Sequence, residues 1–506
     1  MPPDKRLDNL TRRFPDNRRL GAAEFVTGVT VDSRCVQPGY LFIALQGYAA
    51  DGHEFIPEAL ARGAVAVIFD KPAYAEAIPA SVGAILVPNS RRAAAEVAAE
   101  FWDHPSRDLT VVGVTGTNGK TTTAFLVDSI FRAGGACTGL LGTTARFVGG
   151  EAQPADRTTP DSVELQRLLA QMRAEGVTHV TMEVSSHGLV QDRTWMCAFD
   201  AAIFTNLTQD HFDFHVDLED YFAAKLRLFT EYVAPEWSEK SLLAVLNVDD
   251  PAGMRLCALT PARIVPYGLS ERAAVTASEV QITPGGIDFR LHLGEQEPVA
   301  VHLALTGAFN LYNALGAAAC AWGLGVPTDQ IVAGLAQLEA VPGRFERVAL
   351  GQDFTVIVDY AHTPDALANV LRAARALTGP PARLLCVFGC GGDRDRSKRP
   401  QMGRLATEQS DLAIITSDNP RSEPPQAIID EIAGGVASHN YLLEPDRRRA
   451  IFLAVEQCAP GDTLVIAGKG HETYQIIGDR TIPFDDRAVA REAIVQLLGD
   501  IRGPEE

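Results

Sequence analysis

A glycine-rich turn followed by lysine and threonine is the first group of residues whose types and spacing could do chemistry. Residues 115–123 read Thr-Gly-Thr-Asn-Gly-Lys-Thr-Thr-Thr and follow the apolar run Val111–Val114. In a strand, loop and helix of this kind, small residues let backbone N–H groups converge on phosphate oxygens, lysine neutralises their charge and threonine can ligate Mg²⁺. The general pattern expects a glycine where Val114 stands, but the apolar lead-in and the helix-compatible run after Lys120 supply the required context. The sequence therefore predicts a nucleoside triphosphate site.

Two segments that follow further apolar runs could complete a metal site at this loop. Residues 179–184 include Glu183, and a carboxylate at a strand end beside the phosphate loop can hold Mg²⁺ together with Thr121. Residues 205–215 read Thr-Asn-Leu-Thr-Gln-Asp-His-Phe-Asp-Phe-His. These histidines and aspartates suit metal or acid–base work, although ordinary surface polarity explains either segment alone. One imidazole could ligate a second divalent ion, even though Mg²⁺ prefers oxygen ligands.

Four polar clusters later in the chain could recognise a small zwitterionic molecule. They occupy residues 359–365, 391–396, 418–421 and 468–472. Arginines in these clusters can grip a carboxylate or a phosphate in bidentate fashion, while Asp418 and Glu472 can receive an ammonium group. A polar turn explains any one cluster equally well, but four of them after successive strands suggest a common site.

Bulk composition limits the classes of protein to which the chain can belong. Its 506 residues predict three or four domains, at about 100–200 residues per domain, and 46% apolar with 22% charged residues is typical of a globular protein. The net charge of −19 argues against nonspecific binding to nucleic acid or an anionic membrane. With no run of about 18 apolar residues and no signal-peptide core, we expect a cytoplasmic location. The eight cysteines lack zinc-like pairing and are expected to be reduced and mostly buried.

The order of apolar runs predicts an α/β protein of three domains, with boundaries after residues 107 and 340. In residues 1–107, short strands near Ala64–Phe69 and Ala84–Val87 and an alanine-rich helix over Arg91–Phe101 predict a small α/β unit. The segment Val31–Arg34 lies at an early junction of strand and loop in this unit.

Residues 108–340 predict a doubly wound parallel sheet that carries the phosphate loop. Helical stretches alternate with four expected strands at Val111–Val114, His179–Val184, Ala202–Thr205 and Leu243–Leu246. Apolar residues then alternate from 280 to 305, interrupted by Thr-Pro-Gly-Gly at 283–286, and this pattern predicts an antiparallel meander appended to the sheet.

Residues 341–506 predict a second open α/β sheet, introduced by a Pro-Gly linker at 342–343. Its expected strands are Thr355–Val358, Arg383–Phe388, Leu412–Ser417 and Thr463–Ala467. Ligands of such sheets bind beyond the carboxyl ends of the strands, and the four polar clusters stand at those ends.

These motifs together resemble the Mur ligases, the ATP-dependent amide-forming enzymes of bacterial peptidoglycan precursor synthesis. The residues that carry the resemblance are Thr115–Thr123, Thr158–Pro160, Glu183–Leu189, Asp210-His211 and Asp418–Arg421. The similarity spans nearly the whole chain. It implies an N-terminal domain that binds the uridine nucleotide, a central ATPase domain and a C-terminal domain that brings the amino acid. It also implies an ADP-forming reaction through an acyl phosphate.

The resemblance assigns residues to each expected site. ATP would be bound by Gly116, Thr117, Asn118, Gly119, Lys120, Thr121, Thr122, Asn310, Asn313, Arg344 and Asp359. The substrate UDP-N-acetylmuramoyl-L-alanyl-D-glutamate would be held by Val31, Ser33, Thr158, Thr159, Ser185, Gln191 and Arg193. meso-2,6-Diaminopimelate would be bound by Arg394, Asp418, Asn419, Pro420, Arg421, Gly468 and Glu472. The implied catalytic groups are Lys120, Glu183, His211 and Lys225.

Two Mg²⁺ ions are implied as well. Thr121 and Glu183 would hold one ion, and His211 with Lys225 would hold the other. An unmodified lysine would repel a metal, whereas a CO₂-derived carbamate on Lys225 would offer an anionic oxygen. The chain departs from the family pattern at Arg157, where relatives commonly carry asparagine, and this departure puts a direct substrate contact there in doubt.

The expected amino acid follows from the Asp418–Arg421 pattern, which is similar to that of diaminopimelate-adding members. Diaminopimelate differs from lysine by one distal carboxylate, with which Arg421 and Arg394 could pair, while Glu472 and Asp418 could face the distal ammonium. The alternatives are a lysine-adding Mur ligase, a folylpolyglutamate synthetase-like ligase, and a nucleotide-dependent switch with no chemistry of its own. A monomer is expected.

Overall fold

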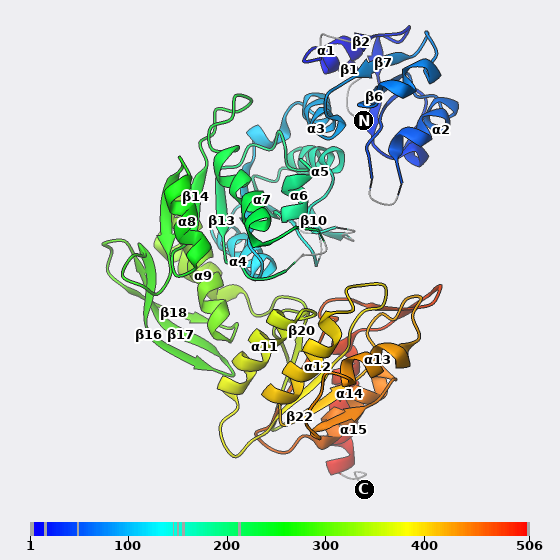
Figure 1. Ribbon diagram of the computed structural model, residues 1–506. Coiled ribbons are helices and arrows are strands. Elements are labelled where there is room, and N and C mark those ends of the chain that lie inside the picture. The colour runs from blue at the N-terminus through cyan, green and yellow to red at the C-terminus, as the bar shows by residue number, and fades with distance from the viewer. Residues whose placement is uncertain are drawn as a thin grey trace.

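Three α/β units follow one another along the chain (Figure 1). The structure is a computed structural model that describes residues 5–14, 18–47, 50–144, 146–148, 151–153, 157–210 and 214–502. The main sheets lie within residues 18–86, 110–303 and 346–467. This arrangement confirms the predicted α/β fold class, with its parallel sheets and appended meander. The boundaries at 107/108 and 340/341 stay predictions.

The first unit is a five-stranded sheet of order β2-β7-β6-β5-β4, parallel except for β2. Its strands are β2 (Arg18–Arg19), β4 (Gly28–Thr30), β5 (Tyr40–Ile43), β6 (Ala66–Phe69) and β7 (Gly83–Leu86), and its main helices are α2 (Ile56–Ala61) and α3 (Ser90–Phe101). A short N-terminal element of β1 (Lys5–Arg6), α1 (Leu7–Thr11) and β3 (Phe25–Val26) joins it. Asn89 caps α3 by accepting hydrogen bonds from the N–H groups of Arg91 and Arg92. The predicted strands and helix of this unit are confirmed.

The central unit is built on an eleven-stranded sheet of order β11-β10-β9-β12-β8-β13-β14-β15-β16-β17-β18. Its strands are β8 (Thr110–Thr115), β9 (Thr138–Leu141), β10 (Arg146–Val148), β11 (Glu151–Gln153), β12 (His179–Glu183), β13 (Ala201–Phe204), β14 (Leu243–Asn247), β15 (Arg263–Tyr267), β16 (Val275–Thr283), β17 (Gly286–Leu293) and β18 (Val299–Leu303). Its helices are α4 (Lys120–Ala133), α5 (Ser162–Ala174), α6 (Ser186–Val190), α7 (Leu218–Thr230), α8 (Pro251–Leu259), α9 (Ala308–Gly323) and α10 (Thr328–Gln337).

Alternating side chains of the central strands feed two apolar layers, one on each face of the sheet. Val112 and Val114 of β8 pack with α4, α9 and α10, whereas Val111 packs with α5, α7 and α8 on the other face. The core strands are parallel, and the meander β16–β18 is antiparallel, as predicted. It begins at Val275, five residues earlier than the alternation indicated. Because β8 lies between β12 and β13, Glu183 and the residues after Phe204 flank the phosphate loop.

The third unit has a six-stranded sheet of order β19-β20-β24-β21-β22-β23, parallel except for β19. Its strands are β19 (Glu346–Val348), β20 (Thr355–Asp359), β21 (Leu384–Phe388), β22 (Leu412–Ile415), β23 (Tyr441–Leu443) and β24 (Thr463–Ala467), followed by the hairpin β25 (Tyr474–Ile477) and β26 (Arg480–Pro483). Helices α11 (Pro364–Leu377), α12 (Lys398–Gln409) and α13 (Pro425–Ala433) cover one face, and α14 (Arg447–Gln457) and α15 (Asp486–Arg502) cover the other. The four predicted strands are confirmed, and the polar clusters follow their carboxyl ends.

All eight cysteines are free, as expected. Cys197, Cys320, Cys386 and Cys390 are buried, but Cys35 and Cys137 are exposed. Among the described residues, no helix combines the length and the apolar character needed to cross a membrane.

Candidate active site

The phosphate loop between β8 and α4 depends on two glycines. Gly116 has φ +148°, and a Cβ there would lie 1.9 Å from Thr205 Oγ1. Gly119 is left-handed at φ +86°, and its Cβ would lie 2.4 Å from Asn313 Oδ1. The loop is anchored to the end of β13, because Asn118 N donates to Asn206 Oδ1 at 2.9 Å. No larger residue fits either glycine position without moving these neighbours.

The Lys120 side chain folds back over this loop. Its Nζ donates to the carbonyl oxygens of Gly116 at 3.0 Å and Thr117 at 2.8 Å. Desolvation lowers the pKa of Lys120, although the nearby carboxylates of Glu183 and Asp210 oppose this effect. The loop thus holds a cation where a phosphate group would lie.

Thr121 and Glu183 meet at the mouth of the loop. Thr121 Oγ1 donates to Glu183 Oε1 at 3.0 Å and accepts from Arg344 Nη2 at 3.1 Å. Glu183 is only 1% exposed, and it also accepts from the N–H of Thr143 at 2.8 Å. Adjacent ligands of an octahedral Mg²⁺ ion lie about 3 Å apart, given Mg–O distances of about 2.1 Å. The two oxygens therefore fit two neighbouring positions around such an ion.

Lys225 of α7 lies beneath the same loop. It is 1% exposed, donates from Nζ to Gly116 O at 2.9 Å and stands 4.4 Å from the centre of the Tyr221 ring. Burial, and then the positive charge of Lys120, lower the pKa of Lys225 well below its ordinary 10.5, while Asp210 opposes the shift. The structure therefore places a readily deprotonated amine beside the phosphate loop.

A second metal site is not formed by the described side chains alone. His211 lies outside the described residues. Its neighbour His215 is engaged at both ring nitrogens, by Asp220 at 3.0 Å and by Ser186 at 3.0 Å. No group of three His, Cys, Asp or Glu side chains able to hold a metal occurs in the described part of the chain.

Of the other residues predicted to bind ATP, Asn313 contacts the phosphate-loop segment directly, whereas Asn310 and Asp359 act through neighbouring residues. On α9, Asn313 Oδ1 accepts from Thr123 at 3.3 Å, and Asn310 accepts from Asn313 Nδ2 at 2.9 Å, so Asn310 acts through Asn313. Asp359 accepts from the N–H groups of Phe345 at 2.7 Å and Ala361 at 2.8 Å. Burial raises the pKa of Asp359, and Arg344 opposes that shift. Asp359 thus fixes the linker turn from which Arg344 reaches Thr121.

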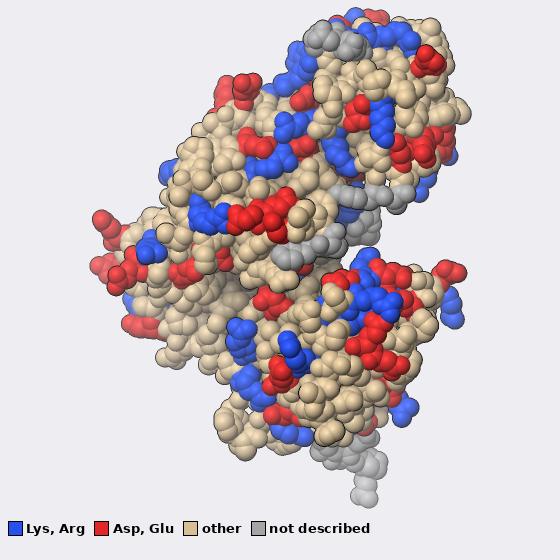
Figure 2. Space-filling model, in the orientation of Figure 1, with Lys and Arg blue, Asp and Glu red and all other residues tan. Residues whose placement is uncertain are grey.

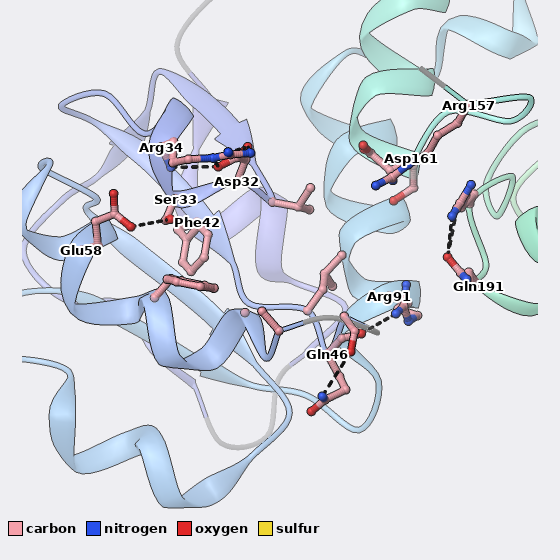
Figure 3. A pocket seen from close by; sticks show the side chains of 18 residues that line it. Asp32, Ser33, Arg34, Phe42, Gln46, Glu58, Arg91, Arg157, Asp161 and Gln191 are labelled. Carbon is pink, nitrogen blue, oxygen red and sulfur yellow. Dashed lines mark hydrogen bonds and ion pairs between the residues drawn. The ribbon is translucent and has the colours of Figure 1, made fainter. Parts of the chain in front are cut away.

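A pocket of about 500 Å³ lies between the first and central units (Figure 3). Val31 and Ser33 line it from the first unit, and Gln191 and Arg193 line it from the central unit. Arg157, which departs from the family pattern, also lines the pocket. The structure therefore brings together four of the seven residues predicted to hold the uridine nucleotide substrate.

The other three residues predicted for that substrate lie around Glu183. Thr159 Oγ1 donates to Glu183 O at 2.9 Å and lies 3.1 Å from Ser185 Oγ. Thr158 Oγ1 lies 3.0 Å from Thr143 Oγ1, which itself donates to Glu183 Oε2 at 3.1 Å. Arg193 Nη1 donates to Thr159 O at 2.9 Å and so connects this hydroxyl cluster to the pocket. Thr143 was not among the predicted site residues, and its local sequence contains no motif that would indicate a role in the site.

In the third unit, residues of both charges gather beyond the carboxyl ends of the strands. A Cβ on Gly391 would lie 2.9 Å from Arg421 Nη1 and 3.7 Å from Arg394 Cγ, so both arginines lie beside Gly391. Arg421 itself has φ +52° and donates to Gly392 O at 2.7 Å. The two predicted carboxylate-binding arginines are therefore neighbours.

The predicted ammonium-binding carboxylates lie at the same sheet edge. A Cβ on Gly468 would lie 2.7 Å from Asp418 Oδ2, and Asn419 Nδ2 donates to Glu472 Oε2 at 2.8 Å. The buried Lys469 was not predicted as a site residue, although it stands in the 468–472 cluster. Its Nζ donates to Glu472 Oε2 at 2.9 Å and to Asn419 Oδ1 at 3.1 Å.

Besides Arg344 of the linker, Asp365 of the third unit reaches the phosphate loop directly. Asp365 Oδ2 accepts from Asn118 Nδ2 at 3.1 Å and from Thr208 Oγ1 at 2.9 Å. Asp365 belongs to the 359–365 cluster, but the sequence did not indicate this contact. Asp365 thus connects the third unit to the phosphate loop of the central unit.

On the face drawn in Figure 2, positive and negative side chains are interspersed rather than gathered into one large basic surface. Arg394 and Arg421 would therefore attract an anion only locally, against an overall charge of −19.

Comparisons with known proteins place these sites in a family. Residues 25–102 match the model of the Mur ligase family, catalytic domain, residues 114–321 match the Mur ligase middle domain, and residues 343–470 match the Mur ligase, glutamate ligase domain. The chain is 46% identical to a protein of Geobacillus thermodenitrificans over 97% of its own length and 99% of the relative's. It is 47% identical to a protein of Gloeobacter violaceus over 98% and 99% of the two lengths. Both relatives are named UDP-N-acetylmuramoyl-L-alanyl-D-glutamate–2,6-diaminopimelate ligase.

Solved structures agree with this assignment. A structure of a UDP-N-acetylmuramoyl-L-alanyl-D-glutamate–2,6-diaminopimelate ligase is 34% identical, has a TM-score of 0.67 and is matched over 94% of this chain and 96% of its own. Folylpolyglutamate synthase of Mycobacterium tuberculosis has a TM-score of 0.62 at 20% identity, with 81% and 95% of the two chains covered, and shares the fold alone. The phosphate loop, the strand-end clusters and these matches lead to one conclusion: the chain belongs to the Mur ligase family.

Proposed function

We propose that this protein is an ATP-dependent, ADP-forming ligase that joins meso-2,6-diaminopimelate to UDP-N-acetylmuramoyl-L-alanyl-D-glutamate. The observation that carries the proposal is the sheet edge where Arg421 and Arg394 flank Gly391 while Asp418 and Glu472 lie nearby. Such an edge offers both charges to a zwitterionic amino acid. The names of relatives that match almost the entire chain support the same substrates.

The reaction would proceed in two chemical steps. The γ-carboxylate of the D-glutamyl residue attacks the γ-phosphorus of ATP, which forms an acyl phosphate and releases ADP. The free amine of diaminopimelate then attacks the acyl carbon, and the tetrahedral intermediate expels inorganic phosphate as the amine loses a proton. The products are an amide, ADP and phosphate.

The chain's own residues would bind and orient the phosphate groups. Lys120 would move from the Gly116 and Thr117 carbonyls to the phosphoryl oxygens, and Arg344 would add charge from the linker. Thr121 and Glu183 are the residues that would hold a Mg²⁺ ion. When bound, that ion would offset the negative charge that spreads over the transferring phosphoryl group.

Lys225 is proposed to carry a carbamate. A neutral amine attacks CO₂ and loses one proton, which leaves an N-carboxylate in place of a cation. The depressed pKa of Lys225 supports this modification, because burial favours the neutral amine. Together with His211, the carbamate would hold a second Mg²⁺ ion.

We assign the pocket between the first and central units to the uridine nucleotide end of the substrate. Val31 and Ser33 would contact it from one side, and Gln191 and Arg193 from the other. Thr158, Thr159 and Ser185 would hold the peptide end near Glu183. The scheme requires no second subunit, and we propose a monomer in the cytoplasm, where ATP is available.

A panel of amino acids, assayed with ATP and UDP-N-acetylmuramoyl-L-alanyl-D-glutamate and scored by product mass, tests the proposal. The wild-type protein should prefer diaminopimelate to L-lysine. Arg421→Ala should lose most of this preference, because leaving a buried charge of the ligand unpaired costs about 2–5 kcal/mol, or roughly 30- to 5,000-fold. Arg396→Ala is the matched control, since that exposed arginine, in the neighbouring loop that carries Arg394, pairs with Glu431 instead.

Each alternative predicts a different result in this panel. A preference for L-lysine would overturn the amino-acid assignment and leave the ligase assignment intact. A folylpolyglutamate synthetase-like enzyme would release phosphate with folate and glutamate rather than with the muramoyl substrate. ATP turnover insensitive to both the muramoyl substrate and any amino acid would overturn the ligase assignment itself.

A further inference from the structure

Two residues of the proposed amino-acid site follow strands that are not neighbours. Asp418 follows β22 and Gly468 follows β24, and β21 lies between these strands in the sheet. Gly468 has φ +116°, and its Cβ would lie only 2.7 Å from Asp418 Oδ2. The Asp418 carboxylate therefore reaches across the end of β21, where Gly389 leaves room. The ladders of β21 end at Ile415 on β22 and at Ile466 on β24, so the residues that lead into Asp418 and Gly468 lie beyond the last pairs.

Arg447, the first residue of α14, spans the separation between β22 and β24 from beneath. It is 1% exposed, and it donates from Nη1 to Ser417 O at 3.3 Å and from Nη2 to Ala467 O at 2.9 Å. These carbonyls belong to the residues immediately before Asp418 and Gly468. One planar guanidinium therefore sets the distance between the two backbones that carry the site.

The guanidinium is itself fixed by Asp486, the first residue of α15. Arg447 Nε donates to Asp486 Oδ1 at 2.8 Å and Nη2 donates to Oδ2 at 2.7 Å, and both side chains are fully buried. This two-bond fork, together with the hydrogen bonds to the two carbonyl oxygens, fixes the position and the plane of the guanidinium. A lysine could neutralise Asp486, but its single nitrogen has no rigid fork with which to reach both carbonyls.

We propose that Arg447 is a positioning residue for the amino-acid site, which it serves by tying the ends of β22 and β24 together across β21. This inference rests on the proposed function, because that proposal assigns Asp418 and Gly468 to diaminopimelate. Arg447 does not contact the amino acid; it holds the main chain that presents the groups that do. Loss of Arg447 should therefore weaken the binding of diaminopimelate and leave the binding of ATP and of the muramoyl substrate unchanged.

The test is the variant Arg447→Lys, assayed for the KM of each of the three substrates and for kcat. We expect the KM for diaminopimelate to rise at least tenfold, while the KM values for ATP and the muramoyl substrate stay within twofold of wild type. Asp486→Asn, which keeps the shape but weakens the hold on Arg447, should raise the same KM by a smaller factor. This second variant keeps the test valid if Arg447→Lys does not fold.

Arg383→Lys is the matched control. Arg383 also pairs with a buried aspartate of the third unit, Asp462, at 2.8 Å, but it stands at the amino end of β21, on the opposite edge of the sheet. Its KM for diaminopimelate should stay within twofold of wild type. Equal changes in all three KM values, or the same change in Arg383→Lys, would overturn the positioning role.

The outcome also separates this inference from the proposed function. If the wild-type protein forms no diaminopimelate adduct, the proposed function fails. If the wild-type protein forms it and a folded Arg447→Lys binds diaminopimelate normally, only the positioning role fails.

Discussion

At the phosphate loop, two lysines donate to the same carbonyl oxygen. Lys120 and Lys225 both approach Gly116 O, at 3.0 and 2.9 Å. Two ammonium groups so close together repel each other, and burial adds to the cost of charging either one. The conflict is relieved if Lys225 is neutral, and a neutral amine at this place is available for reaction with CO₂. The unusual chemistry expected of Lys225 thus follows from its location.

We predict that Lys225 takes up CO₂ at neutral pH. Incubation of the protein with ¹³C-bicarbonate should produce one protein-bound carbamate signal in the ¹³C NMR spectrum, because the lowered pKa leaves the amine neutral without alkaline buffer. Lys225→Ala should lack the signal and lose ligase activity by at least about 100-fold, a few kcal/mol of transition-state stabilisation. A signal that survives in Lys225→Ala would contradict the assignment.

A second residue-scale prediction concerns acid. The pKa of His471 is lowered to about 3, first by desolvation and then by the positive charges of Arg344 and Arg487. The folded protein therefore keeps His471 neutral between about pH 6.5 and 3, where the unfolded chain binds a proton, so stability falls as pH decreases through this window.

The variant His471→Asn should remove this part of the pH dependence. Its free energy of unfolding, measured by urea denaturation, should fall less steeply than that of wild type from pH 6.5 towards pH 4. If the free energies of unfolding of the variant and of wild type differed by the same amount at every pH, the substitution would have removed only the ring contact with Tyr360. Parallel curves of that kind would disprove the titration argument.

Among the secondary-structure elements, the strands with continuous apolar runs could be predicted, whereas strands with interrupted runs could not. β15 contains Pro266, which usually argues against an interior strand. The Pro266 carbonyl accepts from Ala274 N on the β16 side, where the ladder begins only at the Tyr267–Val275 pair, so no strand hydrogen bond is lost by the missing N–H. A proline is therefore tolerated in β15 because of how β16 pairs with it, and the local sequence does not reveal that pairing.

The same distinction applies to the candidate site. The phosphate loop and the strand-end clusters are local, so residue type and position predicted them. The contact between Asn118 and Asp365 joins residues 247 positions apart, and Thr143 reaches Glu183 across 40 positions. Such contacts depend on how the units pack, which neither periodicity nor composition encodes.

At the element scale, we predict that Gly119→Ala disables the phosphate loop. The left-handed backbone alone costs about 1–2 kcal/mol for a residue with a Cβ, and the added carbon would collide with Asn313. The KM for ATP should rise at least about tenfold, which corresponds to 1.4 kcal/mol.

Gly434→Ala provides the control for that substitution. Gly434 has φ −59°, and its Cβ would meet only ordinary contacts at 3.4 Å or more. Its kinetics should match those of wild type. Equal loss in both variants would mean that general destabilisation, not loop geometry, explains the effect.

At the scale of the whole molecule, polar contacts between described residues connect the third unit to the central unit near the nucleotide site. Asp365 bonds Asn118 and Thr208, and Arg344 of the linker bonds Thr121. Residues from both units thus surround the same loop. Movement of the third unit would therefore change the surroundings of the phosphate loop directly.

We predict that Asp365→Ala loosens the phosphate loop in the absence of nucleotide. Two lost hydrogen bonds, each worth about 0.5–1.5 kcal/mol, should speed amide hydrogen exchange in residues 116–119 by roughly tenfold. Asp430→Ala removes an exposed carboxylate from α13, where it accepts a hydrogen bond from Gln426 one turn earlier, and should leave this exchange unchanged. Unchanged exchange in Asp365→Ala would show that the contact does not restrain the loop.

The bridge made by Arg447 has a consequence for how amino-acid choice can evolve. Arg447 holds main-chain carbonyls, a group that every amino acid possesses, and not the side chains that follow them. Mutations at positions 418 and 472, whose side chains are proposed to face the ligand, could therefore alter the choice of amino acid while the spacing of the two backbones is inherited unchanged. A lineage can change its amino acid by exchanging a few side chains, without first rebuilding the scaffold that presents them.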